Sequence, residues 1–327
     1  DIGTPGIYFA YYDKVIVIDN KKKQMWFIAF SDKLLKEIEK DLKTSLNFKK
    51  EYSAGNLPKK PKSNLTLKQY KGKILEIKDK LREGETYQVN FSQRFSCSYG
   101  KDPFELYEKL YKINPSPYSC FIDGELSVIS CSPERLFAIN GGKINVRPIK
   151  GTVPRGKNAA EDKKMIAKLK ASLKDDAELS MIVDLYRNDI GKVCKAGTVK
   201  VKKHRRIEKY SHVIHTVSIV EGELRKNAGI DEIIEAMFPG GSVTGCPKKR
   251  TMEIINRLED YARGLYCGSA GYISFDGNSD FNILIRTFAY RDGNLYFHGG
   301  GGIVTDSDAD SEYKETLDKV EALMRSL

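Results

Sequence analysis

The sequence predicts an α+β fold with antiparallel β-sheets. Segments in which apolar residues alternate, as they do in strands, occur in hairpin-like groups, and segments with helical periodicity separate these groups. That order favours α+β over a regular alternation of strands and helices around a parallel sheet. With 327 residues, 40% of them hydrophobic, the chain can also bury a large core.

Turn signals set the order of the elements. Asp19-Asn20 separates two apolar runs, Gly84 ends a helical pattern, and Asn140-Gly141-Gly142 joins the strands of a hairpin. The Lys-, Pro-, Ser- and Asn-rich residues 45–63 should form an exposed connection. The expected helices span residues 31–44, 65–83, 103–113, 158–173, 176–187, 230–237, 247–262 and 309–326. The expected strands span residues 8–18, 23–30, 87–98, 118–123, 126–131, 135–140, 143–148, 197–203, 213–221, 266–275, 280–291 and 294–298.

The composition and the first residues of the chain predict its cellular compartment and its domain organisation. No apolar run approaches the ~18 residues of a membrane span, and the N-terminus shows no signal peptide. The six cysteines have no CxxC pair, so we expect reduced, mostly buried thiols of a cytoplasmic protein. The chain opens on Asp1-Ile2-Gly3-Thr4 without an initiator Met, and we expect a preceding segment to be missing. Residues 1–63 would then be the remnant of an N-terminal subdomain, before a catalytic core at about 64–327.

The net charge of +11 raises nucleic-acid binding as a second interpretation. However, the Lys-rich helices expected near 31–44, 66–83 and 157–175 also carry Glu and Asp, and interleaved signs are typical of solvated faces. We therefore expect neither a nucleic-acid nor a membrane partner. A positive field would moderately favour a small dianionic substrate.

Five segments contain acidic, basic and glycine residues of the kinds that form catalytic and binding sites. Taken singly they are weak evidence, because an isolated Lys is usually a surface charge and a glycine run is usually a flexible turn. The segments are Ser132-Pro133-Glu134-Arg135, Pro148-Ile149-Lys150-Gly151-Thr152, residues 176–189, residues 241–248, and residues 299–304 followed by 311–316. Together, in this order, they resemble the chorismate-utilising enzymes, the family of the anthranilate, aminodeoxychorismate, isochorismate and salicylate synthases. The resemblance runs from about residue 1 to the C-terminus. It implies one large layered domain of antiparallel sheets flanked by outer helices.

Lys150 decides the branch of the family. Pro148 and Gly151 bracket it, so we expect a short rigid bend that aims its amine at a fixed point. The matching position is usually alanine in anthranilate synthases and lysine in many aminodeoxychorismate synthases. The resemblance implies that this amine attacks ring carbon C2 of chorismate as the C4 hydroxyl leaves, and that ammonia then adds at C4 and expels the lysine. Such a lysine must be partly uncharged.

Two further positions bear on the reaction. Gln88 lies where isochorismate and salicylate synthases place a lysine that activates water, and glutamine cannot act as that base. Glu134 matches the general acid of the family, which protonates the departing hydroxyl, although a Glu after Ser-Pro can also be a structural cap. To donate a proton at pH 7, Glu134 should have a pKa raised by burial or by neighbouring carboxylates.

The resemblance implies a magnesium ion held by Glu178, Glu312 and Glu315. The last two are three residues apart, so they project from one face of the final helix. The acidic stretch 306–311 that precedes them also fits an ordinary helix start rich in caps and first-turn acids. Magnesium would hold the ring carboxylate of chorismate and draw electron density as the C4 hydroxyl leaves.

Other positions match the substrate anchors of the family. The enolpyruvyl carboxylate of chorismate would be held by Tyr266, by the planar fork of Arg286 and by the backbone of the glycine run at 299–302. Alone, Tyr266 would be an ordinary core aromatic. The anchors expected from the resemblance are Tyr266, Arg286, Gly300, Gly301, Gly302, Thr244, His215 and Lys319. His215 could equally be a satisfied histidine of a strand.

Ammonia needs a source. No Gly-x-Cys-x-Gly glutaminase elbow surrounds any cysteine, so a separate glutamine amidotransferase subunit is implied. Lys150 favours an aminodeoxychorismate synthase, which makes 4-amino-4-deoxychorismate for p-aminobenzoate and folate. An anthranilate synthase, which also releases pyruvate, is the alternative. A non-catalytic binding or regulatory paralogue is a third, and the complete set of Glu134, Lys150 and three carboxylates speaks against it.

Overall fold

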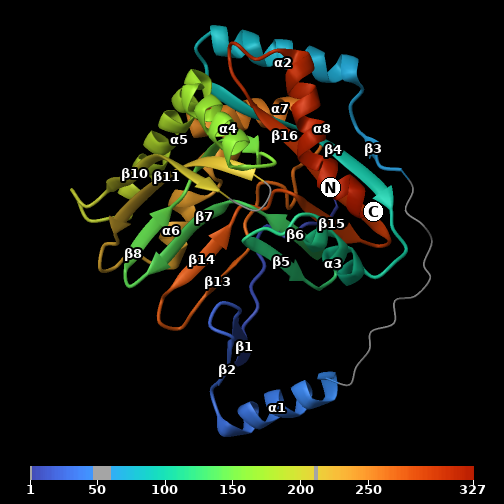
Figure 1. Cartoon of the computed structure of the whole chain (residues 1–327), viewed down its shortest axis with the longest axis vertical. Coiled ribbons are helices and arrows are strands. Elements are labelled where there is room, and N and C mark those ends of the chain that lie inside the picture. Colours follow the sequence, from blue (N-terminus) through green and yellow to red (C-terminus); the bar gives the residue numbers. More distant parts are fainter. Residues whose placement is uncertain (1, 47–59, 210–212) are drawn as a thin grey trace. The chain divides into compact units, whose positions relative to one another are not determined.

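The computed structural model describes residues 2–46, 60–209 and 213–327 (Figure 1). Contacts divide the chain into a small unit within residues 3–54 and a large unit that contains Ile2 and the residues from 55 onwards. Most of the exposed connection expected at 45–63 lies outside the described residues.

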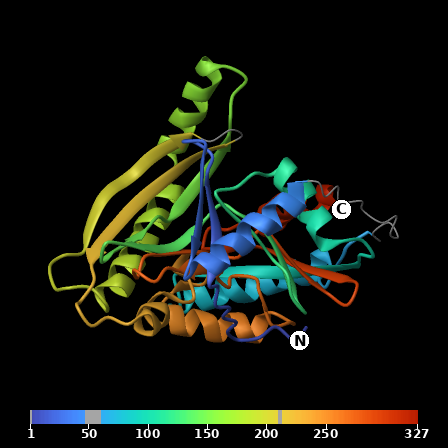
Figure 2. The same cartoon turned by 90° about the horizontal axis from the view of Figure 1, so that it is seen from below.

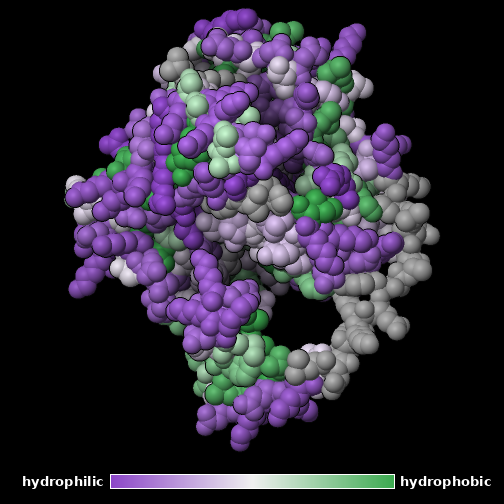
Figure 3. Space-filling view, in the orientation of Figure 1, coloured by the Kyte–Doolittle hydropathy of each residue, from purple (hydrophilic) through white to green (hydrophobic). Residues whose placement is uncertain are grey.

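The small unit is a hairpin followed by a helix. β1 (Lys14–Asp19) pairs antiparallel with β2 (Gln24–Ala29), and α1 (Asp32–Leu46) follows. Lys14 donates a 3.0 Å hydrogen bond to Glu37 and so joins the hairpin to the helix. Many apolar side chains of the two strands are exposed, and they form the green patch on this unit in Figure 3.

The large unit is built on two seven-stranded antiparallel sheets. The first has the order β10-β11-β8-β7-β14-β13 with β9 beside β11, and the second has the order β12-β4-β16-β15-β6-β5 with β3 beside β4. The strands of the first sheet are β7 (Arg135–Asn140), β8 (Lys143–Val146), β9 (Ile149–Pro154), β10 (Lys200–Lys209), β11 (Val213–Glu223), β13 (Gly271–Ile273) and β14 (Ser279–Asn282). The strands of the second sheet are β3 (Lys62–Ser63), β4 (Gln88–Ser98), β5 (Tyr118–Ile122), β6 (Ser127–Ser132), β12 (Gly245–Cys246), β15 (Thr287–Arg291) and β16 (Asn294–Ile303). Figure 2 shows β10 and β11 as a long curved hairpin.

Helices flank both sheets, which confirms the expected α+β class (Figure 1). α5 and α6 pack on the first sheet, whereas α2, α3, α7 and α8 pack on the second. The bounds are α2 (Leu67–Arg82), α3 (Pro103–Ile113), α4 (Ala159–Ala171), α5 (Leu173–Gly191), α6 (Ile230–Met237), α7 (Lys248–Leu258) and α8 (Ala309–Ser326), with a 3-10 turn, η1, at Gly241–Val243. Each sheet therefore closes its own apolar core.

Capping residues explain where several helices begin. The Asp102 carboxylate accepts from the backbone of Phe104 ahead of α3, and the Asp308 carboxylate accepts from Ser311 ahead of α8. Thr66 and Gln69 form a reciprocal capping box at the start of α2. The helices expected at 103–113, 230–237 and 309–326 have the observed bounds.

Among the described strands, four connections carry the chain from one sheet to the other, and two of them lie side by side. The first joins β6 to β7 through Glu134, and the second joins β14 to β15 through residues 283–286. Ile283 N–H donates to the Glu134 carbonyl at 3.0 Å, and Cys131 N–H donates to the Arg286 carbonyl at 3.2 Å. The Ser132 hydroxyl adds a 2.6 Å bond to the Ile283 carbonyl. We call these two segments the paired crossovers.

The expectation of one strand at 280–291 is wrong, because this range contains the second of the paired crossovers. The range is divided because Arg286 has φ 52°, in the left-handed region, and the chain changes sheets there. Two other expectations differ in kind. Lys150 lies in strand β9 opposite Thr216 rather than in an isolated bend, and the glycine run continues β16 because β4 supplies a partner for every residue.

Smaller corrections concern element ends. The first expected strand begins at Lys14 rather than at residue 8, and of residues 266–275 only Gly271–Ile273 pair. All six cysteines are free thiols, four of them buried, as expected. Within the described ranges no helix is long and apolar enough to cross a membrane.

The positive charge is concentrated in the large unit. Residues 155–175 and 200–209 together contain thirteen Lys or Arg and four Asp or Glu. The Arg205 guanidinium donates to the Lys170 carbonyl at 2.8 Å, so α4 and β10 adjoin. Hydrophilic residues cover this part of the face shown in Figure 3. The charge is therefore less evenly spread than its distribution along the sequence suggests.

Ser132→Ala should destabilise the large unit by about 1–3 kcal/mol, because the buried Ile283 carbonyl loses its hydroxyl donor. The melting temperature should fall by about 2–8 °C in a thermal scan. Ser326→Ala is the matched control, since Ser326 is also buried but donates only to the Leu323 carbonyl within its own helix. Equal losses in the two variants would contradict a special role for the paired crossovers.

Candidate active site

The expected site residues converge on the glycine run of β16. A β-carbon added at Gly301 would lie 3.3 Å from Glu312 Oε2, 3.4 Å from Glu315 Oε1 and 3.5 Å from Lys319 Nζ. These short separations place two carboxylates and an ammonium directly over the strand backbone. Only glycine leaves that space open.

The neighbouring glycines face other groups. A β-carbon at Gly302 would clash with the Gln88 amide and lie 3.5 Å from Lys150 Nζ. One at Gly300 would lie 2.5 Å from the Phe91 carbonyl oxygen and 2.7 Å from the Tyr266 hydroxyl. The run therefore separates a carboxylate face at Gly301 from a face that holds Lys150 and Gln88.

Glu312 and Glu315 form one carboxylate pair on α8. Glu312 is buried and accepts a 2.7 Å hydrogen bond from the Ser307 hydroxyl, while half-exposed Glu315 lies 2.6 Å from Lys319. Magnesium uses one or two carboxylates together with substrate oxygens, so two carboxylate oxygens over one glycine fit such an ion. Among the described residues no three His, Cys, Asp or Glu side chains form a preformed metal cluster.

Glu178, the third expected ligand, is placed differently. It lies on α5, and its Oε2 atom is 3.2 Å from Lys150 Nζ. Both side chains are largely buried, which strengthens the electrostatic contact between them. The structure thus brings Glu178 to the amine and the other two carboxylates to Gly301.

Glu134 is held by the paired crossovers and is 7% exposed. Burial raises its pKa, and the Ser242 hydroxyl and the charges of Lys150 and Lys319 oppose that rise. The expected raised pKa is confirmed, and burial rather than a neighbouring carboxylate is its cause. A carboxyl in this environment keeps its proton to a higher pH than an exposed carboxyl does.

Arg286 offers a partly buried positive charge. Among the described residues its guanidinium has one hydrogen-bond partner, the Asn114 amide oxygen at 3.3 Å. Burial lowers the pKa of Arg286. A partly buried guanidinium that has no carboxylate partner among the described residues is suited to an anionic ligand.

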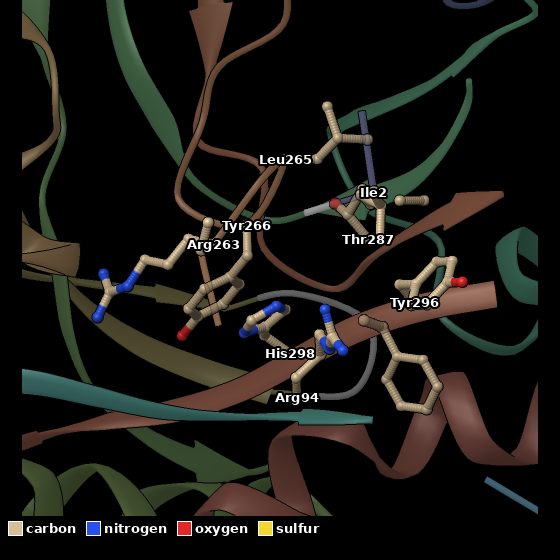
Figure 4. Close-up of a pocket in the computed structure, with 11 residues that line it drawn as sticks. Ile2, Arg94, Arg263, Leu265, Tyr266, Thr287, Tyr296 and His298 are labelled. Atoms are coloured by element: carbon tan, nitrogen blue, oxygen red, sulfur yellow. The ribbon is translucent and has the colours of Figure 1, made fainter. Parts of the chain in front are cut away.

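Tyr266 is fixed from behind by a polar and aromatic network (Figure 4). Its ring stacks on His298 with centroids 5.0 Å apart and planes 8° apart. Arg263 lies beside it and pairs with Glu259 through two hydrogen bonds of 2.8 and 2.6 Å. The cavity among these residues has a volume of about 20 Å³, room for about one water, so it supports Tyr266 rather than holding a substrate.

His215 and Thr244 are both engaged by neighbouring groups. His215 Nδ1 lies 2.8 Å from the Thr152 hydroxyl, and burial with the nearby Arg286 charge lowers its pKa to about 4. The imidazole is therefore neutral at pH 7. The Thr244 hydroxyl donates to the Gly240 carbonyl at 2.9 Å, so it shapes the pocket through the backbone.

Two polar residues that act on Glu134 were not predicted from the sequence. Ser242 and Tyr186 are buried, and both lie within segments that were already singled out by their motifs. Neither carries a charge or a motif role, so only their position in the fold identifies them.

Comparison with known proteins assigns the family. A family model described as chorismate binding enzyme matches residues 1–325, so the chain belongs to the chorismate-binding enzymes. It is 45% identical over 267 residues to "Anthranilate synthase component 1" of Aquifex aeolicus, covering 81% of this chain and 54% of that protein. It is 39% identical over 335 residues to "Aminodeoxychorismate synthase component 1" of Salmonella typhimurium, covering 100% of this chain and 71% of that protein.

Solved structures agree with this family. Anthranilate synthase component I from Streptococcus pneumoniae superposes with a TM-score of 0.86 at 33% identity, covering 96% of this chain and 72% of that one. The isochorismate synthase MenF from Escherichia coli shares the fold, with a TM-score of 0.73 at 19% identity, over 89% of this chain and 68% of that one.

The buried Glu134 carboxyl should make stability depend on pH. A raised folded-state pKa contributes stability below the ordinary Glu value, and this contribution is lost as pH rises through the folded value. Glu134→Gln should therefore melt at a higher temperature than the wild type at pH 8, by about 2–4 °C per kcal/mol gained, and at nearly the same temperature at pH 4.5. Glu125→Gln, at an exposed site, should show no such difference. Calorimetric scans that give no pH-dependent gain for Glu134→Gln would contradict the assignment.

Substitutions at adjacent glycines should separate folding from ion binding. Gly300→Ala should lower the melting temperature by more than about 5 °C, because the new methyl group meets the Phe91 backbone. Gly301→Ala meets only the ends of flexible side chains, so it should fold nearly normally yet bind magnesium about 10-fold more weakly. Titration calorimetry measures the affinity. Magnesium binding unchanged in Gly301→Ala would remove the α8 carboxylate pair from the ion site.

Proposed function

We propose that this chain is the synthase component of an aminodeoxychorismate synthase, which converts chorismate and ammonia to 4-amino-4-deoxychorismate and water. The observation that carries the proposal is the position of Lys150. Its amine faces Gly302 beside Gln88, next to the strand that would hold the substrate. An amine in this place can act as a nucleophile on a bound ring.

The proposed reaction has two displacement steps. The Lys150 amine attacks C2 of chorismate, both conjugated ring double bonds shift, and the C4 hydroxyl leaves as water with a proton from Glu134. Ammonia then adds at C4, the two double bonds shift back, and the C2–N bond to Lys150 breaks as the amine takes up a proton that the added nitrogen releases. Glu178, 3.2 Å from the amine, can accept its proton.

The remaining groups would orient the substrate. The Arg286 fork and the backbone of the glycine run suit the enolpyruvyl carboxylate, and Tyr266 closes the site behind Gly300. Thr244, His215 and Lys319 complete the set of proposed contacts. Because His215 is neutral, it offers hydrogen bonds to the ring substituents rather than a charge.

We also propose magnesium as cofactor, held by Glu312 and Glu315; the third expected ligand, Glu178, contacts Lys150 instead. When bound, the ion would neutralise the ring carboxylate and polarise the ring as the hydroxyl departs. The pair over Gly301 supports this placement, since the two oxygens share one space.

Ammonia would come from a separate glutamine amidotransferase subunit. The sequence contains no glutaminase elbow, and the names of several relatives designate a first component of a larger enzyme. Free ammonium at alkaline pH should substitute, with lower efficiency, in an assay of this chain.

Anthranilate synthesis is the second candidate. The 45% identity to the anthranilate synthase of Aquifex aeolicus exceeds the 39% identity to the aminodeoxychorismate synthase of Salmonella typhimurium, although it covers a smaller share of both chains. The site uses the same acid and anchors for either product. Lys150 separates the two candidates, because anthranilate formation does not need a nucleophile at that position.

Product identification tests the proposal directly. The purified protein is given chorismate, magnesium and ammonium, and both fluorescent anthranilate and p-aminobenzoate are measured with and without an added aminodeoxychorismate lyase. p-Aminobenzoate that forms only with the lyase is the expected result. Anthranilate without the lyase would establish the second candidate, and no product from either route would favour the non-catalytic paralogue.

Lys150→Ala should lower kcat for amination at least about 1,000-fold with little change in KM, since the nucleophile is lost. Lys150→Arg is the control for charge, because it can retain the contact with Glu178 but cannot form the adduct, and it should be equally impaired. Turnover within about 3-fold of wild type in either variant would exclude a covalent lysine step.

A further inference from the structure

Three buried polar atoms beside the reacting groups lack a partner. Glu134 Oε1, Ser242 Oγ and the Tyr186 hydroxyl make no hydrogen bond of good geometry with any described residue. The residues are 7%, 8% and 1% exposed. Most buried polar side-chain atoms in folded proteins are paired, so three unpaired ones in one place call for an explanation.

The fold brings the three together from distant parts of the chain. Glu134 lies on the first of the paired crossovers, where its carbonyl is bonded to Ile283. A β-carbon added at Gly240 would lie 3.1 Å from Ile283 Cδ1 and 3.3 Å from the Tyr186 hydroxyl. Ser242 follows two residues after Gly240, in η1. The phenol of α5 therefore reaches the space between the crossover and this turn.

Ser242 acts on both of the other groups. Burial raises the pKa of Glu134 and the pKa of Tyr186, and the Ser242 hydroxyl opposes the rise in each. Lys150 and Lys319 are the charged groups that face Glu134, and Asp189 is a further charge that acts on Tyr186. Among the described residues, Ser242 is the one that acts on both Glu134 and Tyr186.

We propose that Ser242 and Tyr186 are positioning residues that direct the acidic proton of Glu134 toward the substrate. In this arrangement the Tyr186 hydroxyl donates to Ser242 Oγ, and the Ser242 hydroxyl donates to Glu134 Oε1. The proton of the neutral carboxyl must then reside on Oε2. The inference rests on the proposed function in one respect, the role of Glu134 as proton donor.

This series of hydrogen bonds gives a partner to Glu134 Oε1, Ser242 Oγ and the Tyr186 hydroxyl, and it uses only the hydrogen atoms that these groups carry. A neutral carboxyl has one O–H and one carbonyl oxygen, and it can place the proton on either oxygen unless one of them accepts a hydrogen bond. When Oε2 gives its proton to the departing C4 hydroxyl, water leaves and a buried carboxylate remains. The Ser242 hydroxyl stays bonded to that carboxylate, and the Tyr186 hydroxyl polarises the Ser242 hydroxyl.

Ser242→Ala and Tyr186→Phe test the proposal through the pH dependence of chorismate consumption with magnesium and ammonium. Ser242→Ala should lower kcat about 10- to 100-fold, the effect of losing a hydrogen bond to a buried charge, and Tyr186→Phe should lower it about 3-fold. The chorismate KM should stay within about 2-fold. Because Ser242 stabilises the carboxylate, its loss should move the alkaline limb of kcat to higher pH, and loss of Tyr186 should move it less.

Tyr99→Phe is the matched control. The Tyr99 hydroxyl is also buried without a partner among the described residues, but it lies in the core of the second sheet. Its removal deletes the same atom from a comparable environment and should leave the pH profile unchanged. Thermal scans of each variant confirm that the native fold is kept, and Tyr186→Phe, which deletes one oxygen, retains the test if Ser242→Ala does not fold.

The outcomes separate this inference from the proposed function. If Glu134→Gln keeps full activity, Glu134 is not the acid, and the inference falls with that role. If Glu134→Gln is inactive while both variants keep the wild-type alkaline limb, the two hydroxyls only pack against Glu134 and the inference alone is overturned. Chorismate consumption serves for either product, so the identity of the product does not affect the result.

Discussion

The paired crossovers are the constraint on which the site depends. The backbone bonds from Ile283 to Glu134 and from Cys131 to Arg286 lock two segments that are about 150 residues apart in the sequence. One segment carries a buried carboxyl and the other a partly buried guanidinium, and neither group would be stable in an ordinary core. Because both belong to segments that must change sheets, their positions are set by the topology rather than by local helix or strand preferences. A rigid frame of this kind can hold groups whose burial is unfavourable.

The paired crossovers provide rigidity, whereas the glycine run provides open space beside its backbone. β16 is a central strand of the second sheet, flanked by β4 and β15, so its backbone cannot move far. Glycine weakens a strand, yet here β4 pairs with every residue of the run, and the missing side chains at Gly301 and Gly302 make room for charged and polar groups. Carboxylates occupy the space at Gly301, and the amine and amide occupy the space at Gly302. Pairing thus holds the same four residues in a strand while the missing side chains leave room for other groups.

Local signals predicted much of this fold and long-range contacts determined the rest. Caps, proline positions and apolar periodicity sufficed for helices such as α3 and α8, whose ends depend on neighbouring residues. Lys150 and the glycine run were expected outside regular strands because glycine and proline disfavour strands locally, and only pairing with β11 and β4 overrides that preference. The charged site residues were identified through motif resemblance. Ser242 and Tyr186 were missed, because an uncharged hydroxyl becomes significant only when the fold places it against Glu134.

The charges of the assembled site bear on how substrate and cation would bind. Glu178, Glu312 and Glu315 oppose Lys150, Lys319 and Arg286, and Glu134 is favoured in its neutral form. The site residues are therefore close to neutral as a set, although the chain as a whole carries +11. A dianion that enters a neutral, partly buried site loses hydration without a compensating charge, and so does a divalent cation. The charges of the dianion and of the divalent cation cancel when both are bound. The proposed magnesium ion and the dianionic substrate therefore each supply the charge that the other requires, and their binding should be mutually favourable.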